Sequence, residues 1–428
     1  MHWKNVAVWW ASVVVGVWAY GVGLAHARAG QGLSKGQSMA AERHAQLVRA
    51  LSGDSVVAFN RAVAELAATG QMDDVAWRAT VNSVLKEIDA IRKKRDSTAS
   101  WRFMFLFSSS VVDGLGGGGM KAKEMLNILR NKASTPEVFA GFLAALGRSG
   151  HGSKEAIAFL RQKLADPKTP RVTRIRIRVV LAKLGLKTSE NDAAIVSALK
   201  QRDDEDREIF VNVARMMVLV RPGEWVSEAM IKEMTESLDE DNTSAAVALG
   251  MLGTRARGAL KKLKELNEHA RDRRSGGQIA FTLALARIEP ACRDAELRRL
   301  FKEIPGFFGH TIVVVYAENT FVLVDANLSK HIGEMVADRD ARTHKEALFV
   351  LSSAGLGARA AVPAVLRFVG GDADEQRRAD AARILKDIAD YAQIGQIQAA
   401  RRQQRSVPVR EQLALSITFL RDLKPVSK

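Results

Sequence analysis

The chain repeats one pattern of apolar and polar positions along most of its length. An apolar, alanine-rich stretch runs into Leu-Gly or an equivalent break, and a second apolar stretch follows, most clearly at residues 144–147, 181–185, 248–253 and 351–355. The step from Gly147 to Gly185 is as long as the step from Gly185 to Gly223. Three slightly shorter steps separate Gly253 from Gly355. A period of about 34–38 residues predicts stacked pairs of helices.

Acidic residues mark the same period. They precede the first helix of many predicted pairs, at Asp166, 203–204, 239–241, Asp272, Asp338, Asp340, Asp372 and Asp374. An aspartate at this position accepts hydrogen bonds from the free amides of the first helical turn and favours the positive end of the helix dipole. The glycine breaks and the acidic residues recur with the same period and in the same phase. Together they predict an all-α fold, an elongated α-solenoid of about ten helical hairpins over residues 38–428.

One segment departs locally from this pattern. Residues 311–316 and 320–324 are rich in β-branched and aromatic side chains and flank a short polar stretch, which is typical of a β-hairpin. The segment falls where the repeat phase requires a first helix. Burial in a solenoid can override a helix penalty of about 0.5 kcal/mol per residue. Helix is therefore the favoured prediction for residues 311–324, and a β-hairpin is the alternative.

The best-formed units resemble HEAT-like repeats, the short kind also found in bilin lyases. One unit comprises residues 245–253 followed by Ala256, Ala259, Leu260, Leu263 and Leu266, and another comprises residues 347–355 followed by Ala358, Ala361, Val362, Pro363 and Leu366. Small residues let paired helices approach, leucines fill the layer between units, and glycine closes the helix end. The resemblance implies an armadillo-like helical array that serves as a binding surface.

The first 27 residues differ from the rest of the chain. A short basic start precedes the apolar run 6–24, and small residues at Ala27 and Ala29 offer two cleavage points. This pattern predicts a secretory signal peptide and therefore a periplasmic or secreted protein. The same run approaches the length of about 20 apolar residues that a membrane-spanning helix needs, so an uncleaved anchor is the alternative. Residues 28–37 are predicted to be a linker.

The composition favours a folded, basic protein. Hydrophobic residues make up 47% and charged residues 26%, which excludes a disordered chain. The formal net charge is +16, so an anionic partner is plausible. Cys292 is the single cysteine in the sequence, so no intramolecular disulfide can form.

The sequence offers no strong motif for catalysis, a cofactor or a metal. Around residues 114–121, Met120 separates Gly119 from Lys121 and no Ser or Thr follows, so this run lacks the order of a phosphate-binding loop. The histidines are widely spaced and form neither HExxH nor a haem-attachment motif. No nucleophile elbow occurs. The sequence therefore predicts no catalytic residue, no cofactor, no metal site and no enzyme activity. An enzyme whose catalytic site is assembled from distant residues is the alternative.

Basic residues recur on the predicted second helices. The candidate partner-binding residues are Lys261, Lys262, Lys264, Arg298, Arg299, Arg161 and Lys163. The HEAT-like resemblance implies that second helices line the concave face, where stacking at about 10 Å per helix pair would align these charges. A solvated helix face is the alternative account of the same residues.

Two functions remain as expectations. The first is a non-enzymatic extracytoplasmic scaffold that binds a protein or an anionic envelope polymer through the inner face of the solenoid. The alternative is a nucleic-acid-binding HEAT-like protein with a basic concave groove, because Lys and Arg neutralise phosphates. The predicted leader argues against nucleic acid, since exported proteins rarely meet it. Oligomeric state leaves no signal in the sequence.

Overall fold

Every regular element that the computed structural model describes is helical. The predicted leader and all but the last two residues of the segment 311–324 lie outside the described residues, so the choice between helix and hairpin is untested there. The first described helix begins at Lys35, slightly before the predicted start at residue 38. The described residues are 35–53, 56–93, 109–117, 122–131, 136–149, 154–186, 188–200, 204–240, 242–272, 277–303 and 323–422.

Several helix ends follow the glycine and aspartate signals of the sequence. Four glycines at helix ends have positive φ angles of 55 to 90°, a backbone region that favours glycine, at Gly70, Gly185, Gly253 and Gly355. Asp340 accepts a hydrogen bond from the amide of Thr343, and Asp374 accepts one from the amide of Arg377. The predictions of helix ends at Gly185, Gly253 and Gly355 and of helix caps at Asp340 and Asp374 are confirmed. The predicted caps at Asp166 and residues 239–241 are wrong, because Pro170 precedes the helix that begins at Arg171 and Asn242 caps the helix that begins at Thr243.

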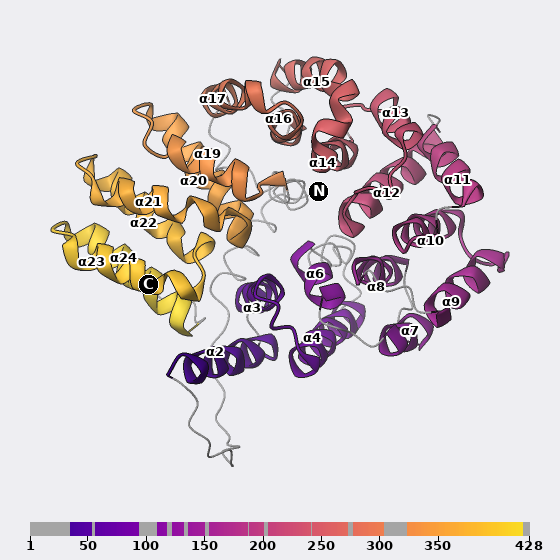
Figure 1. Ribbon diagram of the computed structural model, residues 1–428, viewed down its shortest axis with the longest axis horizontal. Helices are drawn as coiled ribbons and strands as arrows, with labels where there is room; N and C mark the ends of the chain where they lie inside the picture. Colours follow the sequence, from indigo (N-terminus) through magenta and orange to yellow (C-terminus); the bar gives the residue numbers. More distant parts are fainter. Residues whose placement is uncertain are drawn as a thin grey trace, which may run out of the picture.

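Helices of the first two thirds of the chain form two curved layers (Figure 1). The inner layer contains α3 (Val56–Ala68), α6 (Ser109–Gly117), α8 (Pro136–Arg148), α10 (Arg171–Lys183), α12 (Asp204–Val220), α14 (Thr243–Leu252) and α16 (Gly277–Ile288). The outer layer contains α2 (Lys35–Leu51), α4 (Asp74–Lys93), α7 (Ala122–Asn131), α9 (Lys154–Ala165), α11 (Ser189–Lys200), α13 (Glu228–Glu236), α15 (Leu260–Asp272) and α17 (Arg293–Glu303). First helices of the predicted pairs are therefore inside, and second helices are outside.

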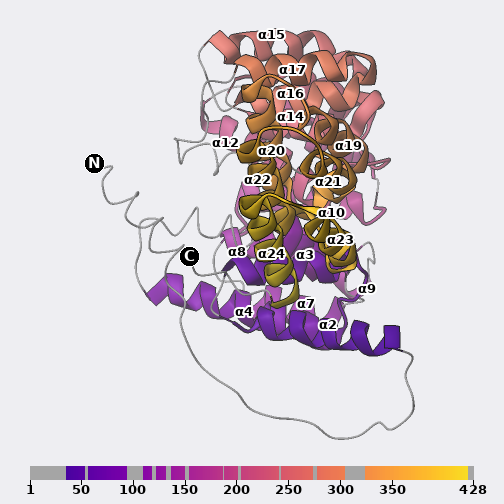
Figure 2. The same ribbon diagram turned by 90° about the vertical axis from the view of Figure 1, so that its left-hand side faces the viewer.

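The C-terminal third continues the stacking in two columns (Figure 2). One column contains α20 (Ala341–Ala354), α22 (Glu375–Ile388) and α24 (Val407–Asp422). The other contains α19 (Ala326–Met335), α21 (Val362–Gly370) and α23 (Ile394–Gln403). Short 3-10 helices join some pairs, namely η1 (Gly253–Ala259), η2 (Pro290–Cys292), η5 (Gly355–Ala361) and η6 (Tyr391–Gln393).

The inner helices are apolar on nearly all sides because other helices surround them. In α16 every residue except Arg287 is buried. In α14 the side chain of Leu249 is fully buried, as its predicted place between units requires. A Cβ atom at Gly250 would lie 2.9 Å from the Cα of Ala284 in α16, so only glycine permits this approach. Small residues thus set the spacing of the inner layer.

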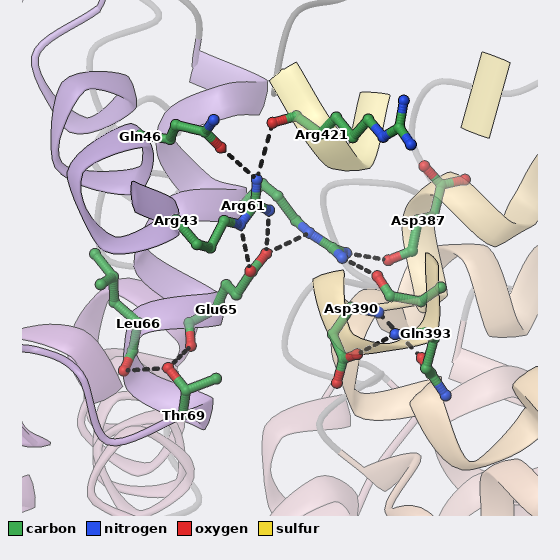
Figure 3. A network of polar contacts seen from close by, with 11 residues as sticks. Arg43, Gln46, Arg61, Glu65, Leu66, Thr69, Asp387, Asp390, Gln393 and Arg421 are labelled. Atoms are coloured by element: carbon green, nitrogen blue, oxygen red, sulfur yellow. Dashed lines mark hydrogen bonds and ion pairs between the residues drawn. The ribbon is translucent and has the colours of Figure 1, made fainter. Parts of the chain in front are cut away.

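The array curls until its two ends meet, so the expectation of an elongated array is wrong. Helices α2 and α3 lie beside α22 and α24, and arginine side chains bridge them (Figures 1 and 3). Arg43 donates to the carbonyl oxygen of Arg421 at 3.2 Å, and Arg61 donates to that of Asp387 at 2.6 Å. The small rotation added by each helix pair accumulates along such arrays, and here it closes a ring.

One stretch of the described chain is long and apolar enough to cross a membrane, by length and composition alone. It runs from Ala341 to Gly370, and 44% of its most apolar window is buried within the protein. The positive φ of Gly355 divides it into α20, η5 and α21. These elements pack as one of the helical pairs, so burial in the array explains their apolar character.

Candidate functional site

The basic residues predicted to bind a partner lie on outer-layer helices. Lys261, Lys262 and Lys264 are on α15, Arg298 and Arg299 are on α17, and Arg161 and Lys163 are on α9. The expectation that these second helices line the inner face is therefore wrong (Figure 1). The group is also split, since α11 and α13 separate α9 from α15 along the outer layer.

Carboxylates partner several of these outer cations. Lys264 Nζ lies 2.9 Å from Glu289 Oε2, and Arg298 pairs with Asp338. Arg299 Nη2 lies 3.0 Å from Oε2 of Glu296. Exposed pairs of this kind are screened by water and salt, and they reduce the local excess of positive charge. The outer layer therefore offers a weaker anion surface than the sequence alone suggests.

A different group of cations gathers where inner-layer helices end. Arg148 is the last residue of α8, Lys183 is the last residue of α10, and Arg221 directly follows α12. Asp113 of α6 pairs with Arg148 and also lies 2.6 Å from Nη2 of Arg221. Among the described residues, Arg148 and Arg221 thus share the carboxylate of Asp113, and Lys183 lies close enough for both arginines to lower its pKa. These three cations and Asp113 form a cationic cluster with an excess of positive charge.

The cluster is partly withdrawn from water, and its charges repel one another. Only 11% of the Arg148 side chain is exposed, and its pKa falls to about 9 because of burial and then because of repulsion from Arg221. Burial also lowers the pKa of Lys183, and the nearby Arg148 and Arg221 lower it further. Burial lowers the pKa of Arg221 as well. An added anion would relieve both the repulsion and the lost hydration.

Glycines bring these helix ends together. A Cβ atom at Gly116 would lie 2.7 Å from the carbonyl oxygen of Ala145, so α6 can approach α8 this closely only with glycine there. A Cβ atom at Gly147 would lie 2.9 Å from a methyl carbon of Val220, at the end of α12. The close packing of α6, α8 and α12 places Asp113, Arg148 and Arg221 within reach of one another.

Arg221 adopts a backbone conformation that side chains usually avoid. Its φ angle is 59°, and among the described residues it is the one non-glycine residue with positive φ. This conformation costs roughly 1–2 kcal/mol for an L-residue. Strained backbone concentrates at functional positions because surrounding contacts must hold it there. Here the strain accompanies the ion pair that points the guanidinium at Asp113.

The sequence does contain a signal for this cluster, in the cations beside the marker glycines. Lys183 and Arg221 each lie just before one of these glycines, at Gly185 and Gly223, so the two cations are themselves one repeat apart. Arg148 directly follows Gly147. The glycines predicted helix ends, whereas no function was predicted for the cations beside them. Periodic cations at the ends of first helices become neighbours when first helices form the inner layer.

The cluster is suited to binding an anion. Its members are three cations and one ion-paired carboxylate. Across the described ranges, no group of three or more His, Cys, Asp or Glu residues is arranged to hold a metal ion. Electrostatic recognition is therefore the chemistry that this arrangement supports.

No protein-family model, curated protein or solved structure matches this chain.

Proposed function

We propose that this protein is a non-enzymatic, exported binding scaffold, a HEAT-like α-solenoid whose inner layer engages an acidic partner. The observation that carries the proposal is the cationic cluster, in which Arg148 and Arg221 share the carboxylate of Asp113 and Lys183 lies near both arginines. Cations that are partly buried and incompletely neutralised bear a desolvation cost, which an incoming anion recovers. Groups with strongly shifted pKa values cluster at functional sites, which supports the proposal.

The shape of the cluster favours a protein partner over a polymer. A long polyanion is usually matched by a stripe of cations that follows its length. The cluster is instead compact, with its cations at the ends of three successive inner helices. One or two carboxylates of an acidic peptide segment would satisfy it through charge-assisted hydrogen bonds. An anionic envelope polymer and a nucleic acid are competing outcomes of the test.

Binding of a fluorescent polyglutamate peptide tests the proposal. The inner variant carries Arg148→Gln, Lys183→Gln and Arg221→Gln, and the matched outer variant carries Lys261→Gln, Lys262→Gln and Lys264→Gln. Both lose three positive charges. We expect the inner variant to weaken binding at least about tenfold and the outer variant to change it less than about twofold. Wild-type binding should also weaken steeply as salt rises.

Two results would overturn this assignment. If the outer variant loses as much affinity as the inner variant, net charge alone drives binding. If a single-stranded oligonucleotide of equal charge binds more tightly than the peptide, the nucleic-acid alternative is favoured. Export has its own test: residues 1–40 fused to a reporter that is active only outside the cytoplasm should give activity. A silent fusion with detectable expression would contradict export.

A further inference from the structure

The two ends of the ring are joined by arginine side chains on one side and main-chain oxygens on the other (Figure 3). Arg61 of α3 donates to the carbonyl oxygens of Asp387 and Ala389, at the end of α22. Arg43 of α2 donates to the carbonyl oxygen of Arg421 in α24 at 3.2 Å. The Arg43 guanidinium also lies 4.7 Å from the ring centre of Tyr391, in cation–π contact.

Glu65 holds both arginines in position for these contacts. It accepts two hydrogen bonds of 2.8 Å from Arg43, in the bidentate geometry that arginine and carboxylate favour. Its Oε2 atom also lies 3.8 Å from Nε of Arg61. All three side chains are at least nine-tenths buried. Burial lowers the pKa of Arg61 to about 10, and Glu65 opposes this shift. The latch, defined as Arg43, Arg61 and Glu65, is therefore prearranged on the N-terminal side.

The joint differs from the contacts within each layer. Adjacent inner helices such as α14 and α16 pack closely along their lengths, with Gly250 against Ala284. Helix α2 packs closely on α3 and α4, and α3 packs closely on α6, whereas neither makes an extensive packing contact with a described C-terminal helix. Carbonyl acceptors can form hydrogen bonds to water once the joint separates. Separating two apolar layers instead exposes their buried surface to water, which costs free energy. At the joint, the described helices are thus linked by polar contacts that water can replace.

We propose that the ring is gated, opening and closing at the joint between its first and last helices, with Arg43, Arg61 and Glu65 as the latch. This inference goes beyond the proposed function, since a gate would operate whatever the ring binds. Opening moves α2 and α3 away from α22 and α24 and leaves the remaining helical pairs intact. The latch stays assembled on α2 and α3, because Glu65 lies on the same side as both arginines.

Distances between spin labels across the joint test the gate. Labels are placed at Ala45 and Gln396, which are exposed on α2 and α23, in a Cys292→Ser background. We expect Arg43→Ala with Arg61→Ala to shift the distance distribution to longer and broader values while helix content by circular dichroism is retained. Arg61→Lys, which keeps the charge but loses one of the two carbonyl contacts, should give an intermediate distribution.

A matched control is provided by Arg255, which also donates to two main-chain oxygens, those of Gly223 and Val226 at 2.9 and 2.7 Å. Arg255→Ala should leave the label distance unchanged, because packed apolar layers hold that junction. An unchanged distribution in the double variant, or equal opening in the Arg255 variant, would rule out the gate.

Hydrogen exchange in the unmodified protein gives an answer even if the double variant fails to fold. Amides of α2 and α24 should exchange well before those of α14 and α16, since opening the joint is a local event. Equal protection in all four helices would contradict a gate at this place.

Discussion

Arg61 donates a hydrogen bond from Nη2 to the carbonyl oxygen of Ala389, a residue 328 positions later in the chain. Both groups are buried, and the same guanidinium also binds the carbonyl oxygen of Asp387. This relationship closes an array in which the main packing contacts join consecutive helices or helices two apart in the sequence. It also makes the charge balance around Arg61 a determinant of stability.

Replacing Glu65 should destabilise the protein strongly. Glu65→Leu leaves Arg43 and Arg61 buried without their carboxylate, a change that typically costs about 3–5 kcal/mol. Urea unfolding measures the loss. The control is Glu334→Leu, which removes an exposed partner of Arg367 and should cost less than about 1 kcal/mol. If the two variants lose the same free energy of unfolding, burial of the ion pairs of Glu65 with Arg43 and Arg61 adds nothing to stability.

Gly147→Ala should destabilise the junction of α8, α10 and α12. The added Cβ would lie 2.9 Å from Val220 and 3.4 Å from Val180, so the helices must separate, at roughly 1–3 kcal/mol. Gly258→Ala is the matched control, because nothing lies within 4 Å of its added Cβ and its φ angle is not positive. We expect thermal unfolding of the control to shift little. If Gly147→Ala leaves thermal unfolding unchanged, the junction accommodates the added Cβ without separating the helices.

Leu249→Ala should cost roughly 2–5 kcal/mol, since the side chain is fully buried in α14 and its removal leaves a cavity. Lys262→Ala, on the partly exposed face of α15, should change unfolding free energy by less than about 0.5 kcal/mol. Denaturant melts compare the two. A loss for Leu249→Ala no larger than that for Lys262→Ala would show that the helix phase is misassigned.

Glu346 should make stability depend on pH. Burial raises its pKa from 4.5 to about 7, and Arg342 opposes the shift only in part. The folded state then binds more protons than the unfolded state between these values, so stability falls as pH rises from about 4.5 to 7 and remains low above it. The full loss is roughly 3 kcal/mol.

Comparison with Glu346→Gln isolates this effect. The neighbouring His344 has a lowered pKa and contributes with the opposite sign, but it is present in both proteins. The stability advantage of the Gln variant over the wild type should therefore grow between about pH 4.5 and pH 7 and stay constant above that range. Parallel pH profiles in urea unfolding would show that Glu346 does not titrate in this range.

Local features of the fold were predictable because local chemistry determines them. Glycine at Gly185 and Gly355 ends a helix by adopting positive φ, and Asp340 caps the start of α20 with its own side chain. Each requires only a few neighbouring residues. Gly147 shows the limit of this reasoning: it lies inside α8 and serves close packing, although it has the same Leu-Gly pattern as a helix end.

Which layer faces inward could not be read from the same local pattern. Helices of both layers are amphipathic or apolar, and the curvature that places α8, α10 and α12 inside depends on small rotations between successive pairs. The candidate residues on α15 and α17 were therefore assigned to the inner face by resemblance alone. Arg148 and Lys183 gain their significance only from the three-dimensional arrangement. The contact of Arg61 with Ala389 likewise has no counterpart in the repeat pattern.

Because the ring closes between its first and last helices, the contacts of the joint can form only after nearly the whole chain has been synthesised. A ribosome adds about 5–20 residues per second, so roughly 16–65 s separate the emergence of Arg61 from that of its acceptor Ala389. Glu65, only 22 residues after Arg43, emerges early and neutralises charge on the nascent helices throughout that interval. A pause or truncation late in translation would leave a nearly complete array whose first and last helices are not joined.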